Sequence, residues 1–432
     1  MSKNPLKLEV HPRSTRLFTS NTSYLEFPEG QTSKDAKERL SKLKNSLEGG
    51  WLSRLIEDCG ANPLVEQPLN EDVSALIRKI VDSVTSEVGR AVVGLCVLQL
   101  TIKAICPDQS IRLHKGGTSS KSFSWVEGIP MRVLDKLFNT PTLRRYGLLK
   151  LNADGVFMTR TLAENYPYSI FYKAAIKGAK EEWLALVEKV EDESINAEVA
   201  LRVLIGMLLN QSEEFENLTF KLQDKLQMMK RKYKTLDEVR LFISQIIESA
   251  PHSARLFEIA MHSYFQVLDA HGTFENNVLK PLTQMRSANK KHGNIGDIEV
   301  LCNSKSETAI IQAWDAKYGK PDLTLELEEL KDKLRNQAQL NRVGFVVNID
   351  HSTISSSLPD LVFKEGEREI AIEVLGFDKW IEEYSKLSGL ANTQLSSEWI
   401  EAFVECLCQK RRELAPIDEP TKAWVQHLLD TN

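Results

Sequence analysis

The sequence predicts an α/β protein, of the α+β kind, with a mainly helical N-terminal half and an α/β C-terminal half. Apolar residues recur at helical spacing over most of the first 250 residues, whereas strand-like and helical segments alternate beyond Pro251. The 432 residues also suggest two or three domains, at about 150 residues each. We therefore expect a helical region over 1–250 and an α/β domain with a central mixed sheet over 251–432.

The first half is expected to consist largely of helices. A short polar segment at its start carries two β-type pieces, at 6–10 and 16–19. Apolar residues at helical spacing then predict a series of helices joined by polar connections. These helices cover 36–47, 51–59, 73–84, 86–105, 131–138, 177–190, 197–209, 215–233 and 236–247.

The second half mixes helices with strands. We expect strands at 296–302, 309–317 and 343–348, and a hairpin of 360–363 with 369–375 around Glu365-Gly366. Helices are expected at 254–270, 325–339, 380–388, 397–414 and 421–429. The order helix, strand, strand, helix, strand predicts an α/β core.

Composition excludes several classes of protein. Hydrophobic residues make up 42% and charged residues 27%, which excludes a disordered chain. Apolar runs fall short of the roughly 20 residues that a membrane span needs, and the N-terminus lacks the apolar core of a signal peptide. Six cysteines without CxxC spacing indicate reduced thiols, so we expect a cytoplasmic protein. No P-loop motif is present, which argues against ATP as a partner.

One stretch of the second half concentrates acidic and basic residues at strand ends. Asp297 begins one predicted strand, and Asp315-Ala316-Lys317 ends the next. Alternate residues of a strand point to the same side, so Asp315 and Lys317 share a face. If the two strands pair as a hairpin, Asp297 lies beside Asp315, and two carboxylates and a lysine converge at one edge of a sheet.

This residue set has a specific chemical use. Two carboxylates and a backbone carbonyl, here that of Ala316, are hard oxygen ligands of the kind that Mg²⁺ prefers. Such a metal acidifies a water molecule and neutralises charge on a scissile phosphate, which bare carboxylates would repel. Lys317 can orient or deprotonate the water.

The arrangement resembles the PD-(D/E)xK nuclease superfamily, most of all its type II restriction endonucleases. Gly296-Asp297 is similar to the first acidic position, with glycine in place of proline, and Asp315-Ala316-Lys317 is similar to D-x-K. Members often carry a further glutamate on the preceding helix, and Glu258 stands there. The resemblance covers about 120 residues closely and implies Asp297, Asp315, Lys317 and Glu258 as catalytic residues.

The resemblance implies Mg²⁺-dependent, sequence-specific hydrolysis of double-stranded DNA. It also implies a homodimer, with one active site for each strand, and a companion DNA methyltransferase encoded elsewhere. Two alternatives stay open. One is a catalytically inactive DNA-binding protein with a nuclease-like fold, and the other is a repair nuclease without sequence preference.

A second acidic pair competes with the first. Pro359-Asp360 is followed by Glu373-Val374-Leu375, which matches the superfamily pattern except that leucine replaces the lysine. Lys379 on the following helix could supply that lysine. A plain β-hairpin is the better interpretation of these residues.

DNA contacts require a local basic surface, because the formal net charge is -5. The stretch 108–173 is rich in Arg, Lys, Gly and Ser and poor in acids, so we expect it to hold and read DNA. A smaller basic cluster before Asp297 is expected to contact the backbone near the cut site. The predicted contacts are Arg112, Lys115, Ser119, Lys121, Arg144, Arg145 and Asn165 in the first region, and Arg286, Lys290 and Lys291 in the second.

Overall fold

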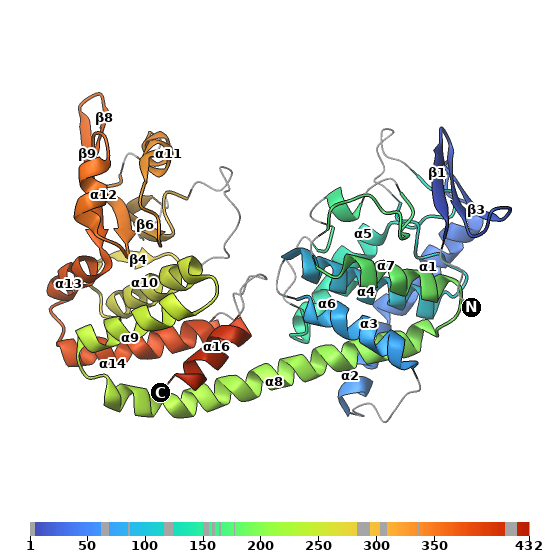
Figure 1. Ribbon diagram of the computed structural model, residues 1–432, viewed down its shortest axis with the longest axis horizontal. Helices are drawn as coiled ribbons and strands as arrows, with labels where there is room; N and C mark the ends of the chain where they lie inside the picture. Colours follow the sequence, from blue (N-terminus) through green and yellow to red (C-terminus); the bar gives the residue numbers. More distant parts are fainter. Residues whose placement is uncertain are drawn as a thin grey trace. The chain divides into compact units, whose positions relative to one another are not determined.

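The protein is a mixed α/β protein, as the sequence predicts (Figure 1). The computed structural model describes residues 5–61, 69–84, 87–115, 124–149, 155–157, 160–163, 166–176, 178–282, 294–302, 309–335, 337, 339–410 and 421–431. These residues divide into two compact units, one ending at Phe215 and the other beginning at Glu216. Helix α8 (Ala197–Lys232) therefore contributes residues to both units, and the division falls upstream of the predicted boundary at 250.

Unit 1 begins with a small antiparallel sheet. Its strands are β1 (Lys7–His11), β2 (Ser14–Phe18) and β3 (Tyr24–Pro28), in that order. The first two correspond to the β-type pieces of the sequence, whereas β3 was not predicted. A small apolar core of Leu17, Phe27, Leu113 and Trp125 lies against the sheet.

The rest of unit 1 is helical. Its longer helices are α1 (Lys34–Glu48), α2 (Trp51–Ala61), α3 (Glu71–Asp82), α4 (Glu87–Ile105), α7 (Lys180–Glu191) and the first part of α8. A continuous helical segment also runs through α5 (Met131–Leu134), the π-helical turn η1 (Asp135–Asn139) and α6 (Thr140–Arg145). A 3-10 turn, η2 (Arg160–Leu162), follows.

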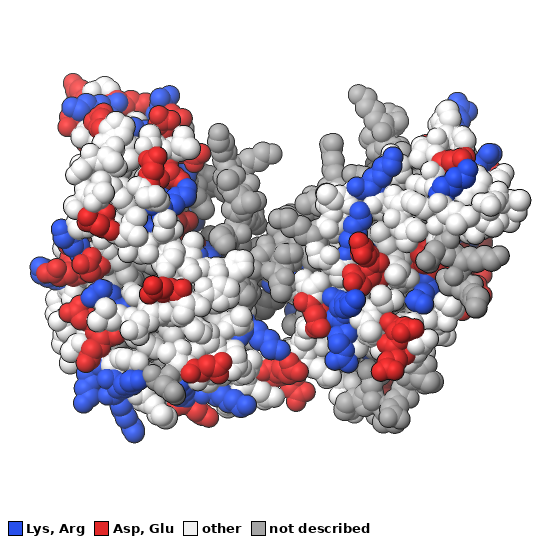
Figure 2. Space-filling model, in the orientation of Figure 1, with Lys and Arg blue, Asp and Glu red and all other residues white. Residues whose placement is uncertain are grey.

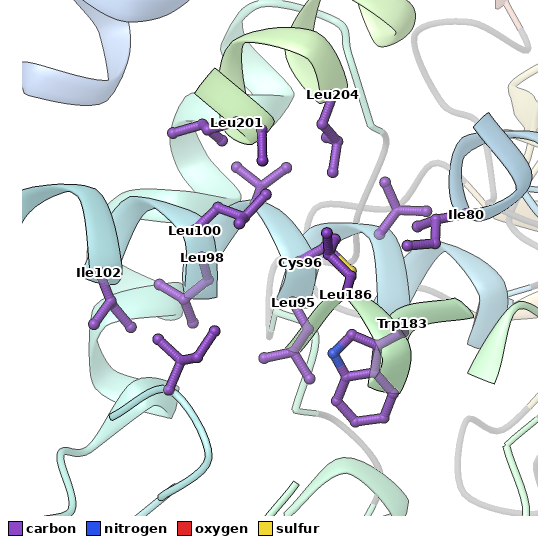
Figure 3. Packing of buried hydrophobic residues seen from close by; sticks show 14 of the residues in the cluster. Ile80, Leu95, Cys96, Leu98, Leu100, Ile102, Trp183, Leu186, Leu201 and Leu204 are labelled. Carbon is purple, nitrogen blue, oxygen red and sulfur yellow. The ribbon is translucent and has the colours of Figure 1, made fainter. Parts of the chain in front are cut away.

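Helix α4 lies at the centre of the core of unit 1. Figure 3 shows its side chains Leu95, Cys96 and Leu98 packed among residues from α3, α7 and α8. A buried glutamine joins two of the surrounding segments, because Gln99 accepts a hydrogen bond from Trp183 Nε1 at 2.8 Å and donates to the Ile111 carbonyl at 2.9 Å. The Gln99 amide therefore links α7 and the chain at Ile111 to α4 inside a largely apolar core.

Unit 2 is built around a mixed sheet, as predicted. Among the described residues the sheet has six strands in the order β4 (Asn277–Leu279), β5 (Ile298–Cys302), β6 (Ile310–Lys317), β7 (Arg342–Val347), β9 (Arg368–Gly376) and β8 (Val362–Glu365). Strands β6, β7 and β9 are parallel, whereas the other neighbours pair antiparallel. The carboxyl ends of the three parallel strands thus meet at one edge.

Helices cover both faces of this sheet. They are α9 (Leu236–Ser249), α10 (Ser253–Ala270), α11 (Thr324–Leu334), α12 (His351–Ser357), α13 (Phe377–Ser388), α14 (Asn392–Glu405) with the π turn η3 (Cys406–Lys410), and α16 (Thr421–Asp430). On one face, Trp314 of β6 packs in an aromatic cluster with Trp380 and Tyr384 of α13. On the other face, Ala313 of β6 belongs to an apolar core that includes Leu327 of α11.

Some elements differ from the sequence-based expectation. Helix α8 is continuous where two helices, 197–209 and 215–233, were predicted, because the polar residues between them include no glycine or proline to end a helix. Strand β4 and helix α12 were too short to recognise. The predicted helix 397–414 begins earlier, at Asn392, and its last residues lie outside the described part of the chain. Within that described part, no helix has the length and apolar character needed to span a membrane.

We predict that Gln99→Met destabilises the protein by about 1–3 kcal/mol, because it leaves the Trp183 indole N–H and the Ile111 carbonyl buried without partners. Urea unfolding followed by circular dichroism measures the change. Gln31→Met, at an exposed position of the same unit, is the matched control. Equal midpoints for the two variants would show that this amide link carries no stability.

Candidate active site

The predicted strand pairing brings Asp297 and Asp315 together. Strands β5 and β6 are antiparallel neighbours, with Ile298 opposite Trp314 and Glu299 opposite Ala313. Continuing this register by one residue places Asp297 opposite Asp315. The backbone N–H of Ala316 donates a hydrogen bond to Asp297 Oδ2 at 3.0 Å. The connecting turn, 303–308, lies outside the described residues.

Asp315 and Lys317 share one face of β6, as strand alternation requires. Lys317 Nζ lies 2.9 Å from Asp315 Oδ2, and the two side chains are 19% and 17% exposed. Trp314, the residue before Asp315, points to the opposite face of the strand. There its indole N–H donates a hydrogen bond to the Tyr384 hydroxyl at 2.9 Å. The end of β6 thus carries an anchored aromatic ring on one side and the charged pair on the other.

The two carboxyl groups are electrostatically unfavourable neighbours. Asp297 is exposed as a residue, yet the protein surrounding its carboxyl group and the adjacent Asp315 raise the pKa of Asp297 well above its usual value. For Lys317, burial lowers the pKa, but the Asp315 and Asp297 carboxylates outweigh burial and raise it. Lys317 is therefore charged at neutral pH, and Asp297 retains a proton at pH values where an ordinary aspartate has lost it.

Glycine at position 296 follows from the closeness of the two strands. A Cβ atom at Gly296 would lie 2.6 Å from the Trp314 carbonyl oxygen, which is a steric clash with backbone. Proline, which stands at this position in the name of the superfamily, carries that Cβ. The departure from the proline pattern thus has a local steric reason.

Glu299 holds the segment that carries Asp297, and sequence analysis missed it. Its side chain is buried, and Oε1 accepts hydrogen bonds from the backbone N–H groups of Ile295, at 2.5 Å, and Gly296, at 3.3 Å. Its other oxygen forms an ion pair with Lys280. The sequence signal was an acidic residue two positions after Asp297 in an apolar strand, which places both on one face.

Glu258 lies on α10 in an ion pair with Arg255. Both side chains are nearly buried, at 11% and 1% exposure for Glu258 and Arg255. Burial lowers the pKa of Arg255 to about 10, whereas the negative charge of Asp297 acts in the opposite direction. Arg255 is therefore an electrostatic neighbour of both acids, and it belongs to the site although the sequence-based prediction gave it no role.

The oxygen donors fit a small divalent cation. Among the described residues no three His, Cys, Asp or Glu side chains gather as a metal site. Mg²⁺, however, is commonly bound by one or two carboxylates and keeps several waters. Asp297 and Asp315, with the Ala316 carbonyl, meet that requirement, and a bound cation would favour the charged form of Asp297, which desolvation and the neighbouring Asp315 disfavour.

The second acidic pair does not form a comparable cluster. Glu373 of β9 receives two hydrogen bonds from Arg342, at 2.7 and 2.8 Å. Asp360 interacts with Lys331 of α11, and Lys379 hydrogen-bonds to His351 at 2.9 Å. Each residue is thus engaged with a partner outside the proposed set, which agrees with the interpretation of 360–375 as a hairpin.

The predicted DNA contact at Arg112 requires correction. Its guanidinium is buried, forms a bidentate ion pair with Glu188, and donates to the Tyr168 carbonyl at 2.8 Å. His114, counted in the same basic stretch, is also buried, and burial together with Arg132 lowers its pKa to about 4. Arg112 was misassigned because local composition does not reveal a distant partner such as Glu188.

The remaining basic candidates differ in their surroundings. Lys115 is half-buried and donates to the Thr32 hydroxyl at 2.5 Å, whereas Arg144 and Arg145 of α6 are exposed. Arg145 donates to Ser53 Oγ at 2.5 Å and lies over the Tyr146 ring. The other predicted contacts lie outside the described residues, namely Ser119, Lys121, Asn165, Arg286, Lys290 and Lys291.

Comparison with known proteins gives no further assignment. No protein-family model matches the chain, and no curated protein matches it significantly in sequence. The arguments for function therefore rest on the geometry and electrostatics of Asp297, Asp315 and Lys317.

We predict that affinity for Ca²⁺ or Mg²⁺ rises with pH, by up to about tenfold per unit, until the pH exceeds the raised pKa of Asp297. The sign follows because the cation displaces a proton that the metal-free site retains. Calorimetric titration in two buffers of different ionisation enthalpy measures the released proton. Binding that is independent of pH between 5 and 8 would contradict this assignment; for Asp297→Asn we expect weak binding without proton release.

The role of Glu299 can be tested by removing its negative charge. Glu299→Gln leaves Lys280 without its carboxylate and weakens the support of the Asp297 segment, so divalent-cation affinity should fall by about tenfold or more. Glu328→Gln, at an exposed position of α11, is the matched control. Unchanged affinity in a folded Glu299→Gln protein would mean that Glu299 serves the fold alone.

Proposed function

We propose that this chain is a Mg²⁺-dependent endonuclease that hydrolyses phosphodiester bonds at a specific sequence in double-stranded DNA, similar to type II restriction endonucleases. The observation that carries the proposal is the grouping of Asp297, Asp315 and Lys317 where β5 begins and β6 ends, with a raised pKa on Asp297. Raised pKa values at a clustered acid pair are typical of functional sites.

The roles of the residues follow from their charges. Asp297 and Asp315, with the Ala316 carbonyl, would hold the metal, which when bound supplies positive charge to the phosphate and acidifies a coordinated water. Lys317 forms an ion pair with Asp315 and is protonated at neutral pH. We therefore assign it to stabilising the negative charge of the phosphate by hydrogen bonding and not to acting as a base. Water adds to phosphorus and releases a proton to the solvent, while the bond to the leaving oxygen breaks and that oxygen takes up a proton.

Glu258 supports the site indirectly in this proposal. Because it pairs with Arg255, it keeps a positive charge near Asp297 in a fixed position. It acts through Arg255 rather than as a ligand. This role differs from direct participation in catalysis, which the resemblance to the superfamily implies.

The proposal includes the partners that the resemblance implies, which are DNA, a second copy of the chain and a methyltransferase. A restriction endonuclease acts on DNA in the cytoplasm, cuts both strands as a homodimer, and accompanies a methyltransferase that protects host DNA. Among the described candidates of unit 1, Arg144 and Arg145 are exposed and could contact DNA.

We predict that Asp315→Ala and Lys317→Ala each lower the rate of DNA cleavage at least about a hundredfold while DNA binding in Ca²⁺ persists. Exposed residues provide matched controls, Asp332→Ala for the acid and Lys364→Ala for the base. Gel analysis of phage DNA incubated with Mg²⁺ measures cleavage.

The products separate the possible functions. Discrete fragments support the restriction endonuclease, a smear supports a nuclease without sequence preference, and intact DNA that remains bound supports an inactive DNA-binding protein. Full cleavage by both Asp315→Ala and Lys317→Ala would contradict the assigned site whatever the product pattern.

A further inference from the structure

One helical segment of unit 1 exposes basic and apolar side chains and no acid. It runs from Met131 to Arg145 through α5, η1 and α6 and is called here the 131–145 segment. Its exposed charged residues are all cations, namely Arg132, Lys136, Arg144 and Arg145. Its single acid, Asp135, is buried. The formal net charge of the whole chain is -5, and Figure 2 shows red and blue side chains interspersed on the visible surfaces, so an all-cationic helix face is a local feature.

Three hydrogen bonds hold the Asp135 carboxylate inside the protein. Its Oδ1 accepts from Asn139 Nδ2 and Thr140 Oγ1, both at 2.9 Å, and its Oδ2 accepts from the Val156 backbone at 2.7 Å. Gly155 approaches so closely that a Cβ there would overlap this carboxyl group. The acid is thus held inside the protein, and the exposed charged side chains that the segment itself contributes are all basic.

The π-helical turn aligns the cations. An α-helix advances by about 100° per residue, so without an extra residue Thr140 and Leu143 would fall on the same side as Arg132 and Lys136. The π turn adds about one residue to the turn, which returns Thr140 and Leu143 to the core, where both are buried. The same shift of about 100° brings Arg144 into line with Arg132 and Lys136.

The cationic face continues past the start of the helix. The backbone N–H of Lys115 donates to the Ile129 carbonyl at 2.9 Å, which places Lys115 beside the entry to the segment. Apolar side chains lie among the cations, since Val133 and Leu137 are 41% and 57% exposed. Fifteen residues of helix span about 20 Å, a length comparable with about six base-pair steps along the duplex axis.

We propose that the 131–145 segment is the DNA-contacting helix of unit 1, with Arg132, Lys136 and Arg144 on the phosphate backbone and Val133 and Leu137 against the groove. The proposal rests on the proposed function for its partner. Charge complementarity carries it, because a helix face that lacks acids and spaces its cations over this length matches a polyanion of regular charge spacing.

The test compares two triple variants of equal charge. Arg132→Ala/Lys136→Ala/Arg144→Ala removes three cations from the segment, whereas Lys34→Ala/Lys37→Ala/Lys42→Ala removes three exposed lysines from α1, which also exposes acids. Binding of duplex DNA in Ca²⁺ is measured at several salt concentrations. We expect the first variant to bind at least tenfold more weakly, with a salt slope smaller by about 2–3, and the control to bind like the wild type. Equal effects of the two variants, or none, would overturn the proposal.

A second variant keeps the proposal testable if the triple variant folds poorly. Lys136→Cys labelled with a photoactivatable crosslinker should become attached to duplex DNA, and the same label at Lys37→Cys should not. Absence of crosslinking at position 136 in protein that binds DNA would overturn the proposal.

The outcome is separable from the nuclease assignment. If the 131–145 segment carries DNA binding but Mg²⁺ produces no cleavage, this proposal stands and the nuclease proposal fails. If the triple variant binds and cleaves DNA like the wild type, the nuclease proposal stands and this one fails. A wild-type protein that does not bind DNA would overturn both.

Discussion

The proximity of two like-charged groups is the constraint on which the candidate site depends. Asp297 and Asp315 face each other because β5 and β6 pair in a register that places them opposite, and the protein around the Asp297 carboxyl group together with Asp315 raises its pKa. Sheet hydrogen bonds and apolar packing on both faces fix that register. The charged cluster is therefore held in an unfavourable arrangement by the stability of the surrounding sheet, which is common at functional sites.

Several local features of unit 2 make that arrangement possible. Gly296 lets the chain pass close to the backbone of Trp314, and the buried Glu299 fixes the backbone just before Asp297. Lys280 compensates the charge of Glu299, so the support does not add a further unpaired acid. On the opposite face, the hydrogen bond from Trp314 to Tyr384 anchors β6 one residue before Asp315. The supporting residues thus differ in chemistry but act on the same two strand ends.

Sequence periodicity predicted the elements that bury a clear apolar pattern. Strands β5, β6 and β7 and most helices of unit 1 were recognised because alternation or helical spacing extends over enough residues. Short elements such as β4 and α12 carry too few residues for a pattern. Strand alternation also placed Asp315 beside Lys317, since that relation is local in sequence.

Contacts between distant segments could not be predicted in the same way. Arg112 appeared to be a surface cation, but its partner Glu188 lies on another helix, and nothing in the local sequence identifies the pair. Glu299 resembled an ordinary strand residue until the fold brought it to Lys280. In the 131–145 segment, the sequence gave no sign of the π turn that brings Arg144 into line with Arg132 and Lys136.

The proton retained by Asp297 has a consequence for folding. A carboxyl group whose pKa is higher in the folded than in the unfolded state adds stability below the unfolded pKa, and that contribution disappears as pH rises through the folded pKa. The metal-free protein therefore keeps its site neutralised at low pH by protonation and loses that stabilisation as the proton leaves. If the site binds a divalent cation as proposed, that cation would supply the missing charge at higher pH and stabilise the fold there by mass action. In the proposed site, a proton at low pH and a divalent cation at higher pH would thus neutralise the same pair of carboxyl groups.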